Sequence, residues 1–432
     1  MKQFLSPFAA LLNLNSGFQP ALIWLAFGAF ASVGHAQTAR VLDAPFLDVL
    51  RAEVRTNHPT LAAAQAKVQA AEAGVRAVRL WEDPMVGLGV MAAENMMRRE
   101  DGDLMFSAEQ TVPRRKLYGA RKARAAAESS ILQAETQSAA LKLETLVAQT
   151  AVELALADEV VAIATNQVRW LESMAVNARQ RLADPAANAS EPLRVESELV
   201  QEQQRLDTST RQRTRLVREL NLLLGRPLDA VWPVLRLPDT ASPMPQLTDE
   251  LGRLLQANPM LHAQLKTAEA ARADIEVARR ERSPTFSVGV DSRVYSGGDF
   301  RQATVGAKMS LPWFNGSVYR ANVDRARQQQ AVTEREIEAL ERDLRKQIVA
   351  AHTEAENAAR QAATFADQVI PRAGQATEAT QNAWISSKAI LFEVLESRRA
   401  LLNAQLEQRR AVAAQRGALE TLRSIVPPTS KP

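Results

Sequence analysis

Five methionines gather in one short part of the sequence, and thioether ligation is the chemistry they could provide. They are Met85, Met91, Met96, Met97 and Met105. A thioether sulfur is a soft ligand that suits Cu(I). No histidine or cysteine stands among them to complete a metal site. The pattern therefore favours ordinary strand and loop residues over a metal site, and we assign no metal ligand.

Histidine and cysteine, the usual residues of metal and catalytic sites, are scarce. Beyond the N-terminal segment the chain has only His58, His262 and His352, far apart on predicted helices, and it has no cysteine. The lack of cysteine excludes thiolate ligands, disulfides and cysteine nucleophiles. No phosphate-binding loop, Ser-His-Asp set or pair of carboxylates stands out. We therefore expect neither an enzyme nor a bound cofactor.

The charge balance argues against a nucleic-acid partner. The 53 Lys and Arg residues face 49 Asp and Glu residues, a formal net charge of +4. These charges are scattered along predicted helices instead of forming a basic stripe with aromatic residues. Aromatic residues make up only 5% of the chain, while alanine and leucine abound, which favours long helices.

The N-terminus has the pattern of a signal peptide. Lys2 precedes an apolar run at 21–31 that is too short to span a bilayer. Small residues at Gly34 and Ala36 then predict cleavage before Gln37. We therefore expect export of the mature chain.

Two halves of the chain repeat each other at an offset of 200 residues. Pro59, Arg79 and Pro84 recur as Pro259, Arg279 and Pro284, and Gly89-Val90 recurs as Gly289-Val290. So long a period indicates a duplicated domain-sized module and not a solenoid. Each module begins with a predicted helix, at 45–80 and at 247–281, continues with two strands and ends in a long helical hairpin.

Long stretches without glycine or proline, 120–184 and 317–370, predict very long helices. Sixty-five helical residues extend about 100 Å. In the first stretch apolar and small residues follow the alternating 4-3 spacing of a coiled-coil seam. The seam consists of Leu143, Val147, Thr150, Leu154, Ala157, Val161, Ala164, Val168 and Leu171.

The predicted strands, at about 85–93, 104–112, 285–295 and 303–311, alternate apolar and polar residues. Transmembrane barrel strands show this alternation, although a soluble hairpin has the same pattern. Four strands cannot close a barrel, and lipid does not tolerate open edges, so several chains must share one barrel if these strands lie in a membrane. Twelve strands from three chains would suffice. The candidate lumen residues are Glu109, Lys308, Asp291 and Arg293.

The motifs in both halves resemble the TolC-like outer-membrane efflux family. The resemblance rests on Asn57-His58-Pro59-Thr60-Leu61, Asn258-Pro259-Met260-Leu261, Leu222-Leu223-Leu224-Gly225-Arg226-Pro227, Val369-Ile370-Pro371-Arg372-Ala373 and Phe392-Glu393-Val394-Leu395. It implies a mainly α fold with a small β part: coiled-coil helical hairpins and two β-hairpins per chain, in a homotrimeric channel. It also implies a shared barrel in the lipid of the cell outer membrane and a helical tunnel in the periplasm.

The same resemblance implies partners at the hairpin tips: an inner-membrane pump, of the RND type, and a periplasmic adaptor (membrane fusion protein). The candidate contact or gate residues are Leu182, Asp184, Pro185, Glu191, Trp384, Ser387 and Lys388. This chain departs from the family at the tips, because Pro185 and Ser387 stand where a glycine is usual. Arg114-Arg115-Lys116 is either a lipid-headgroup anchor or a solvated helix start.

Glu82-Asp83-Pro84-Met85 and Glu109-Gln110-Thr111-Val112-Pro113 resemble the heavy-metal (CzcC/CusC-type) branch, so metal cations are the expected cargo. Export of drugs or small organic solutes is the alternative. A remoter one is a soluble periplasmic coiled-coil adaptor or scaffold. The expected organisation is a signal peptide (1–36), a first efflux repeat (37–228), a linker (229–246), a second efflux repeat (247–427) and a tail (428–432).

Overall fold

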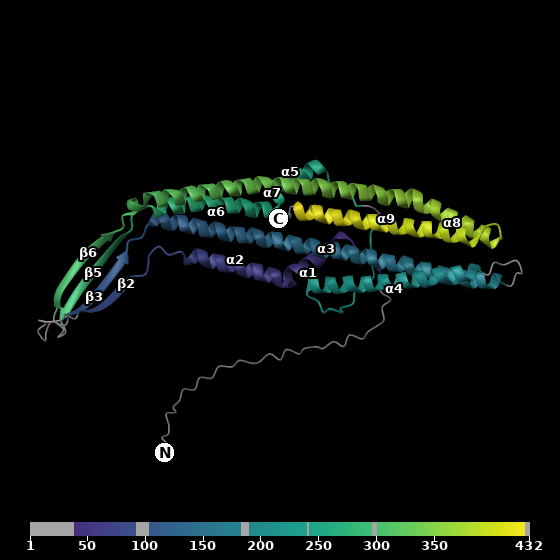
Figure 1. Ribbon diagram of the computed structural model, residues 1–432, viewed down its shortest axis with the longest axis horizontal. Coiled ribbons are helices and arrows are strands. Elements are labelled where there is room, and N and C mark those ends of the chain that lie inside the picture. Colours follow the sequence, from purple (N-terminus) through teal and green to yellow (C-terminus); the bar gives the residue numbers. More distant parts are fainter. Residues whose placement is uncertain (1–38, 92–102, 183–189, 240–241, 296–299, 428–432) are drawn as a thin grey trace, which may run out of the picture. The chain divides into compact units, whose positions relative to one another are not determined.

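The computed structural model describes residues 39–91, 103–182, 190–239, 242–295 and 300–427 (Figure 1). Long helices make up most of it and strands form a small part, as the sequence predicts. No helix in these ranges is both long enough and apolar enough to cross a membrane. Asp184, Pro185, Met96 and Met97 lie outside the described residues.

The same order of elements occurs twice along the chain. The first copy consists of α1 (Ala44–Asn57), α2 (Pro59–Ala77), β2 (Met85–Met91), β3 (Asp103–Thr111), α3 (Arg115–Arg181) and α4 (Ser190–Leu224). The second consists of α5 (Leu247–Ala257), α6 (Pro259–Glu281), β5 (Phe286–Tyr295), β6 (Phe300–Met309), the 3-10 turn η1 (Pro312–Asn315), α7 (Gly316–Thr364), the π-helical turn η2 (Phe365–Val369), α8 (Ile370–Ile385) and α9 (Leu391–Ile425).

The helices expected at 45–80 and 247–281 are each broken in two, which corrects the prediction. The breaks fall at His58 and Asn258, whose backbones are extended (ψ 122° and 115°). Each precedes a proline, which disfavours the helical conformation in the residue before it and supplies no N–H of its own. Proline is well suited to the first helical position, so a new helix begins at Pro59 and at Pro259. The Asn258 side chain caps that start by accepting a hydrogen bond from the Leu261 N–H (2.8 Å).

The coiled-coil seam predicted in α3 is confirmed. Six of its nine residues are buried and the other three are partly buried. Its middle part belongs to a core shared with α1, α4 and α9, which includes Val147, Leu154 and Leu220. A second core packs the outer ends of both hairpins together, and a third joins α5, α6 and α7 to the end of α9.

A π-helical turn lies within the long helix of the second copy. It ends two residues before Pro371. Proline lacks the N–H that would bond to the carbonyl four residues earlier, and its ring clashes with that carbonyl. A wider turn relieves this conflict, and such single turns mark extra residues inserted in a helix. The helix therefore continues through η2 into α8 without a break.

The predicted linker is attached to α3 by two adjacent carboxylates. Within it, β4 (Leu235–Arg236) pairs in parallel with β1 (Arg40–Val41). Asp158 accepts a hydrogen bond from the Leu235 N–H (2.8 Å), and Glu159 accepts one from the Leu237 N–H (2.9 Å). Alternate residues of an extended strand point the same way, which lets neighbouring carboxylates on the helix bind both amides.

The four longer strands form one antiparallel sheet in the order β2-β3-β5-β6. The two hairpins, 200 residues apart in sequence, meet where β3 pairs with β5. Figure 1 shows this sheet at the end of the long helices where α6 finishes and α3 and α7 begin. Strands β2 and β6 are its two edges.

Candidate functional site

One face of the sheet is apolar and exposed. Strand register places Leu88 opposite Phe106, and Val290 opposite both Ala108 and Val305, so alternate residues of all four strands share this face. Leu88 is 78% exposed and Val305 is 73% exposed. Large apolar side chains on neighbouring strands form a contiguous patch, which in a water-soluble monomer marks an interaction site or a membrane contact.

The opposite face of the sheet is polar and has an ion pair near the strand ends that adjoin the helices. Glu109 on β3 accepts hydrogen bonds from the Ser287 hydroxyl on β5 and the Lys308 ammonium on β6, each 2.6 Å long. Asp291 and Arg293 lie on this same face, because they alternate with Val290 along β5. The sheet thus brings the four candidate lumen residues to one surface, and their role in conduction stays a prediction.

The described methionines of the cluster also lie on the polar face. Met85 is paired with Glu109, Met105 with Gly89, and Met91 with Asp103, so all three alternate with the apolar residues of β2 and β3. Met85 is largely exposed. Within the described residues no group of three or more His, Cys, Asp or Glu side chains could hold a metal ion. The three thioethers therefore share the polar face of the sheet.

The far ends of the two hairpins are tied together by one arginine of α3. Arg181 donates hydrogen bonds to the Trp384 carbonyl oxygen and to the Ser387 hydroxyl, both 2.8 Å long. Its guanidinium also stacks on the indole ring of Trp384, 4.6 Å from the ring centre. The sequence analysis missed this contact, because the partners are over 200 residues apart and no local pattern links them.

Trp384 requires a correction. It is a candidate for adaptor contact or for the gate, yet it is only 2% exposed, which contradicts the contact and leaves the gate a prediction. It packs with Leu171 and Met174 of α3 and with Leu391 of α9 in the core that joins the hairpins. Burial of so large an aromatic side chain contributes to stability but removes it from any outer surface. Trp384 thus holds the tips together.

The other described tip residues remain accessible. Leu182 caps α3 and is exposed, Glu191 lies in the first turn of α4 and is partly buried, and Lys388 is exposed in the turn after α8. Ser387 has a positive φ of 58°, the backbone conformation that glycine adopts most easily. This geometry explains why a glycine would suit the position where the sequence has a serine. The roles of these residues in docking or gating stay predictions.

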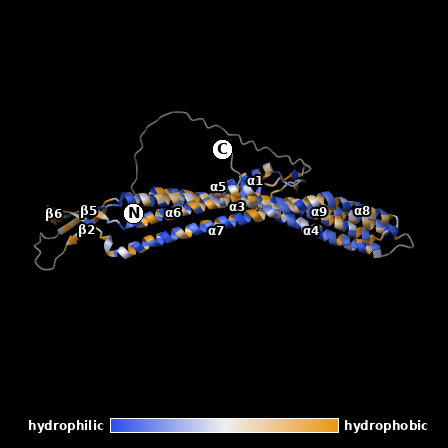
Figure 2. Cartoon of the chain, turned by 90° about the horizontal axis from the view of Figure 1, so that it is seen from above, coloured by the Kyte–Doolittle hydropathy of each residue, from blue (hydrophilic) through white to orange (hydrophobic). Residues whose placement is uncertain are grey.

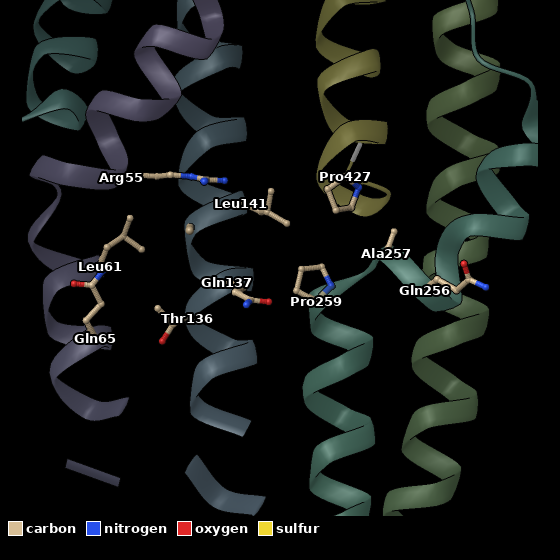
Figure 3. A pocket seen from close by; sticks show the side chains of 11 residues that line it. Arg55, Leu61, Gln65, Thr136, Gln137, Leu141, Gln256, Ala257, Pro259 and Pro427 are labelled. Carbon is tan, nitrogen blue, oxygen red and sulfur yellow. The ribbon is translucent and has the colours of Figure 1, made fainter. Parts of the chain in front are cut away.

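A groove of about 570 Å³ opens midway along the helices, where the two copies face each other (Figure 3). Gln65 of α2 and Gln137 of α3 line one side, and Gln256 and Pro259 line the other. Arg55 at its rim is bound to Glu144. Neutral amides and a paired arginine supply neither an acid-base pair nor a nucleophile, so the groove offers no catalytic chemistry.

Comparisons with known proteins agree with this geometry. Residues 251–426 match the model of the outer membrane efflux protein family. No curated protein matches the chain by sequence. Similar solved structures include CusC, in a study of folding and transmembrane channel formation (TM-score 0.76, 17% identity, 88% of this chain and 91% of that one).

Two further channels are similar at comparable levels. One is the open state of the MtrE outer membrane channel of Neisseria gonorrhoeae (TM-score 0.74, 16% identity, 88% of each chain). The other is the outer membrane protein VceC of Vibrio cholerae (TM-score 0.73, 16% identity, 88% of this chain and 96% of that one). The chain therefore has the fold of these outer-membrane channels, and its residues 251–426 carry the pattern of the outer membrane efflux protein family.

Proposed function

We propose that this chain is the outer-membrane channel of a tripartite efflux system. In this proposal it passes cargo to the exterior from an inner-membrane pump, of the RND type, through a periplasmic adaptor. The observation that carries the proposal is the sheet at the end of the long helices. One face is apolar and exposed, the other contains the ion pair of Glu109 and Lys308, and both edges lack a neighbouring strand within the described chain. Lipid suits the first face and a water-filled lumen suits the second.

The need to close the sheet into a barrel is the reason for proposing a homotrimer. A membrane-exposed edge leaves backbone N–H and C=O groups without partners, at several kcal/mol each. The edge β6 of one copy can pair with β2 of the next, and three copies of four strands close a twelve-stranded barrel. The long helices of the three copies would then form a tunnel below it, in the periplasm, with the hairpin tips toward the pump and adaptor.

Heavy-metal cations are the proposed cargo. Met85, Met91 and Met105 lie on the proposed lumen face together with Glu109, so soft sulfur ligands and a carboxylate line one surface. Such a surface suits brief contacts with Cu(I) or similar cations and not tight binding. Drugs and small organic solutes are the alternative cargo, and the likeness to CusC and MtrE, at similar TM-scores and identities, does not decide between the two.

Deletion of the gene tests the proposed cargo. Growth and cell-associated metal would be measured across copper, silver, zinc, cobalt, cadmium and nickel, beside a panel of drugs. We expect selective sensitivity to one group of metals, with accumulation of those metals in the cells. Sensitivity to drugs at unchanged metal tolerance would replace the metal assignment with the alternative cargo.

Cell fractionation separates the channel from a soluble periplasmic scaffold. A channel anchored by its sheet requires detergent for extraction and follows the outer membrane. Recovery in a detergent-free periplasmic wash would contradict the membrane role of the apolar face. The matched control is a variant with Val86, Leu88 and Val90 changed to threonine, which places β-branched residues that favour strands at all three positions but weakens partition into lipid.

A further inference from the structure

A groove of about 700 Å³ lies at the sheet end of the second copy, between α6 and α7. Four arginines line it: Arg279 and Arg282 at the end of α6, and Arg320 and Arg327 in the first turns of α7. Asp324 is the one acidic residue among the lining side chains, which leaves three net positive charges. Figure 2 shows this part of α7 as largely hydrophilic.

Two of these arginines are already neutralised. Arg279 pairs with Glu276 (2.6 Å) and Arg327 pairs with Asp324 (3.1 Å). For Arg282 and Arg320 the described part of the chain provides no ion pair within 4.0 Å. Two uncompensated guanidinium groups beside one concave surface favour an anionic ligand, because each presents a planar set of donors that matches an oxyanion.

The first copy has an equivalent groove that serves as an internal comparison. It measures about 370 Å³ and is lined by Arg79, Arg114 and Arg121. Arg79 pairs with Asp83, Arg114 donates to the Ser283 carbonyl oxygen (3.2 Å), and Arg121 pairs with Glu281 (3.5 Å). All three arginines thus have partners, and the fold alone does not require free ones.

The difference between the grooves lies at two adjacent sequence positions. At the offset of 200 residues that relates the copies, Glu82 is replaced by Arg282 and Asp83 by Ser283. The substitution removes the acid that neutralises Arg79 in the first copy and adds a further positive charge in the second. Within the described chain, the second groove therefore has two arginines without an ion pair, Arg282 and Arg320, whereas the first has only Arg114, which is bonded to a carbonyl oxygen.

The groove sits where the proposed membrane boundary lies. Ser283 and Pro284 line it and lead directly into β5, while Trp313 and Phe314 follow β6 and are 57% and 79% exposed. Exposed aromatic residues beside the end of a membrane strand are typical of the headgroup level. Tyr319 adds a further amphipathic ring to the groove wall.

We propose that this groove binds the phosphate of an anionic phospholipid headgroup, with Arg282 and Arg320 as its ligands. The proposal rests on the membrane placement of the sheet given above. A free phosphate ion has the same charge chemistry, but it would gain nothing from Trp313 and Phe314. The acyl chains of a bound lipid would instead lie along the apolar face of the sheet next to the groove.

The test measures lipids retained by the purified full-length protein in a non-ionic detergent, counted by native mass spectrometry. The probes are dioleoyl phosphatidylglycerol, dioleoyl phosphatidylcholine and inorganic phosphate. We expect the wild type to retain the anionic lipid preferentially, and the double variant Arg282→Glu with Arg320→Gln to bind it about tenfold more weakly, since each basic residue near a membrane surface contributes a several-fold factor. Arg282→Glu installs the residue that the first copy has at this position.

Arg325→Gln is the matched control, because it removes one exposed arginine at the same end of α7 but outside the lining of the groove. Circular dichroism and the oligomeric state identify a variant that merely fails to fold. Equal retention of both lipids, or an equal loss in Arg325→Gln, would overturn the proposal. Saturation by inorganic phosphate without preference for phosphatidylglycerol would assign the groove to free phosphate and reject the lipid. Because this readout does not involve export, its failure is distinguishable from failure of the efflux function.

Discussion

Ser387 closes the second hairpin tip in a conformation that most residues avoid. Among the described residues other than glycine, it is the one with a positive φ. Left-handed backbone costs roughly 1–2 kcal/mol for a residue that carries a Cβ atom. Part of this cost is offset by the hydrogen bond that the Ser387 hydroxyl accepts from Arg181. The tip thus combines a local backbone strain with a contact that links it to the other hairpin.

Ser387→Gly and Ser387→Ala separate these two effects. Both variants lose the hydroxyl that Arg181 binds, and only the glycine variant relieves the backbone strain. We expect the glycine variant to be more stable than the alanine variant by about 1 kcal/mol. The measurement is the thermal unfolding midpoint of the helices by circular dichroism. Equal midpoints would show that the tip relaxes to a different backbone when the hydroxyl is absent.

Glu159 makes the attachment of the linker depend on pH. Burial raises the pKa of its carboxyl, and the Leu237 N–H and the Arg409 charge only partly oppose this effect. A raised pKa in the folded state means that the stability from this group is present at low pH and is lost as the pH rises through that pKa. We therefore expect Glu159→Gln to gain stability relative to the wild type as the pH increases from about 4.5.

The unfolding midpoints of the wild type and Glu159→Gln at pH 4.5 and 7.5 provide the measurement. The control is Glu153→Gln, at an exposed position of the same helix. A midpoint of Glu159→Gln that falls relative to that of the wild type from pH 4.5 to 7.5 would contradict the effect of burial. It would show that the ion pair of Glu159 with Arg409 (3.1 Å) dominates instead.

At the scale of single residues, the sequence reveals the direction of strand side chains but not long-range contacts. The period-2 alternation of the strands places Glu109 and Lys308 on one face, because successive strand residues point to opposite sides. It contains no information on the Arg181 contact with Trp384, which depends on how two hairpins pack. For the same reason the sequence does not show that Trp384, a candidate contact or gate residue at a tip, is buried.

At the scale of elements, long helices and their seams are the most predictable part of this fold. A run without glycine or proline and with a regular 4-3 spacing leaves few alternatives to a coiled coil. The breaks at His58 and Asn258 were missed because apolar periodicity continues across each proline. The pair β1-β4 was also missed, since strands of two residues are too short to show a period.

Leu154→Ala tests the seam of α3. Leu154 is fully buried in the core shared by α1, α3 and α4, so removal of its side chain leaves a cavity. We expect a loss of about 2–5 kcal/mol in the free energy of unfolding. Leu146→Ala is the matched control on the same helix, where the side chain is 43% exposed. Equal losses for the two variants in denaturant titrations would show that α3 does not pack through this seam.

At the scale of the whole molecule, the sheet is incomplete as a single chain. Leu88 on the β2 edge and Val305 on the β6 edge both belong to the apolar face, three strand spacings apart. Three spacings amount to about 14 Å. A disulfide requires Cα atoms within about 7 Å, so these edges cannot be joined within one copy of the open sheet.

Because the natural chain has no cysteine, paired cysteines provide a clean test of barrel closure. Leu88→Cys would be combined in turn with Ala303→Cys, Val305→Cys and Ala307→Cys, so that three registers of β2 against β6 of the neighbouring copy are tested. We expect at least one pair to give covalent dimers and trimers on mild oxidation, and no larger species. Val290→Cys with Val305→Cys is the control, because these residues pair directly within one sheet and their bond leaves the chain monomeric on a denaturing gel.

The π-helical turn before Pro371 makes the long helix of the second copy tolerant of a change in length. Buried and partly buried positions run through Ala355, Ala358, Ala362 and Phe365 at steps of three and four, then step by five residues to Ile370. A single inserted residue would normally rotate everything beyond it by about 100° and turn the buried stripe outward. Here the wider turn absorbs the extra residue, so the two sides of the helix keep a common inner face. A length mismatch of one residue is thus confined to one turn of the helix and does not disturb the packing on either side of it.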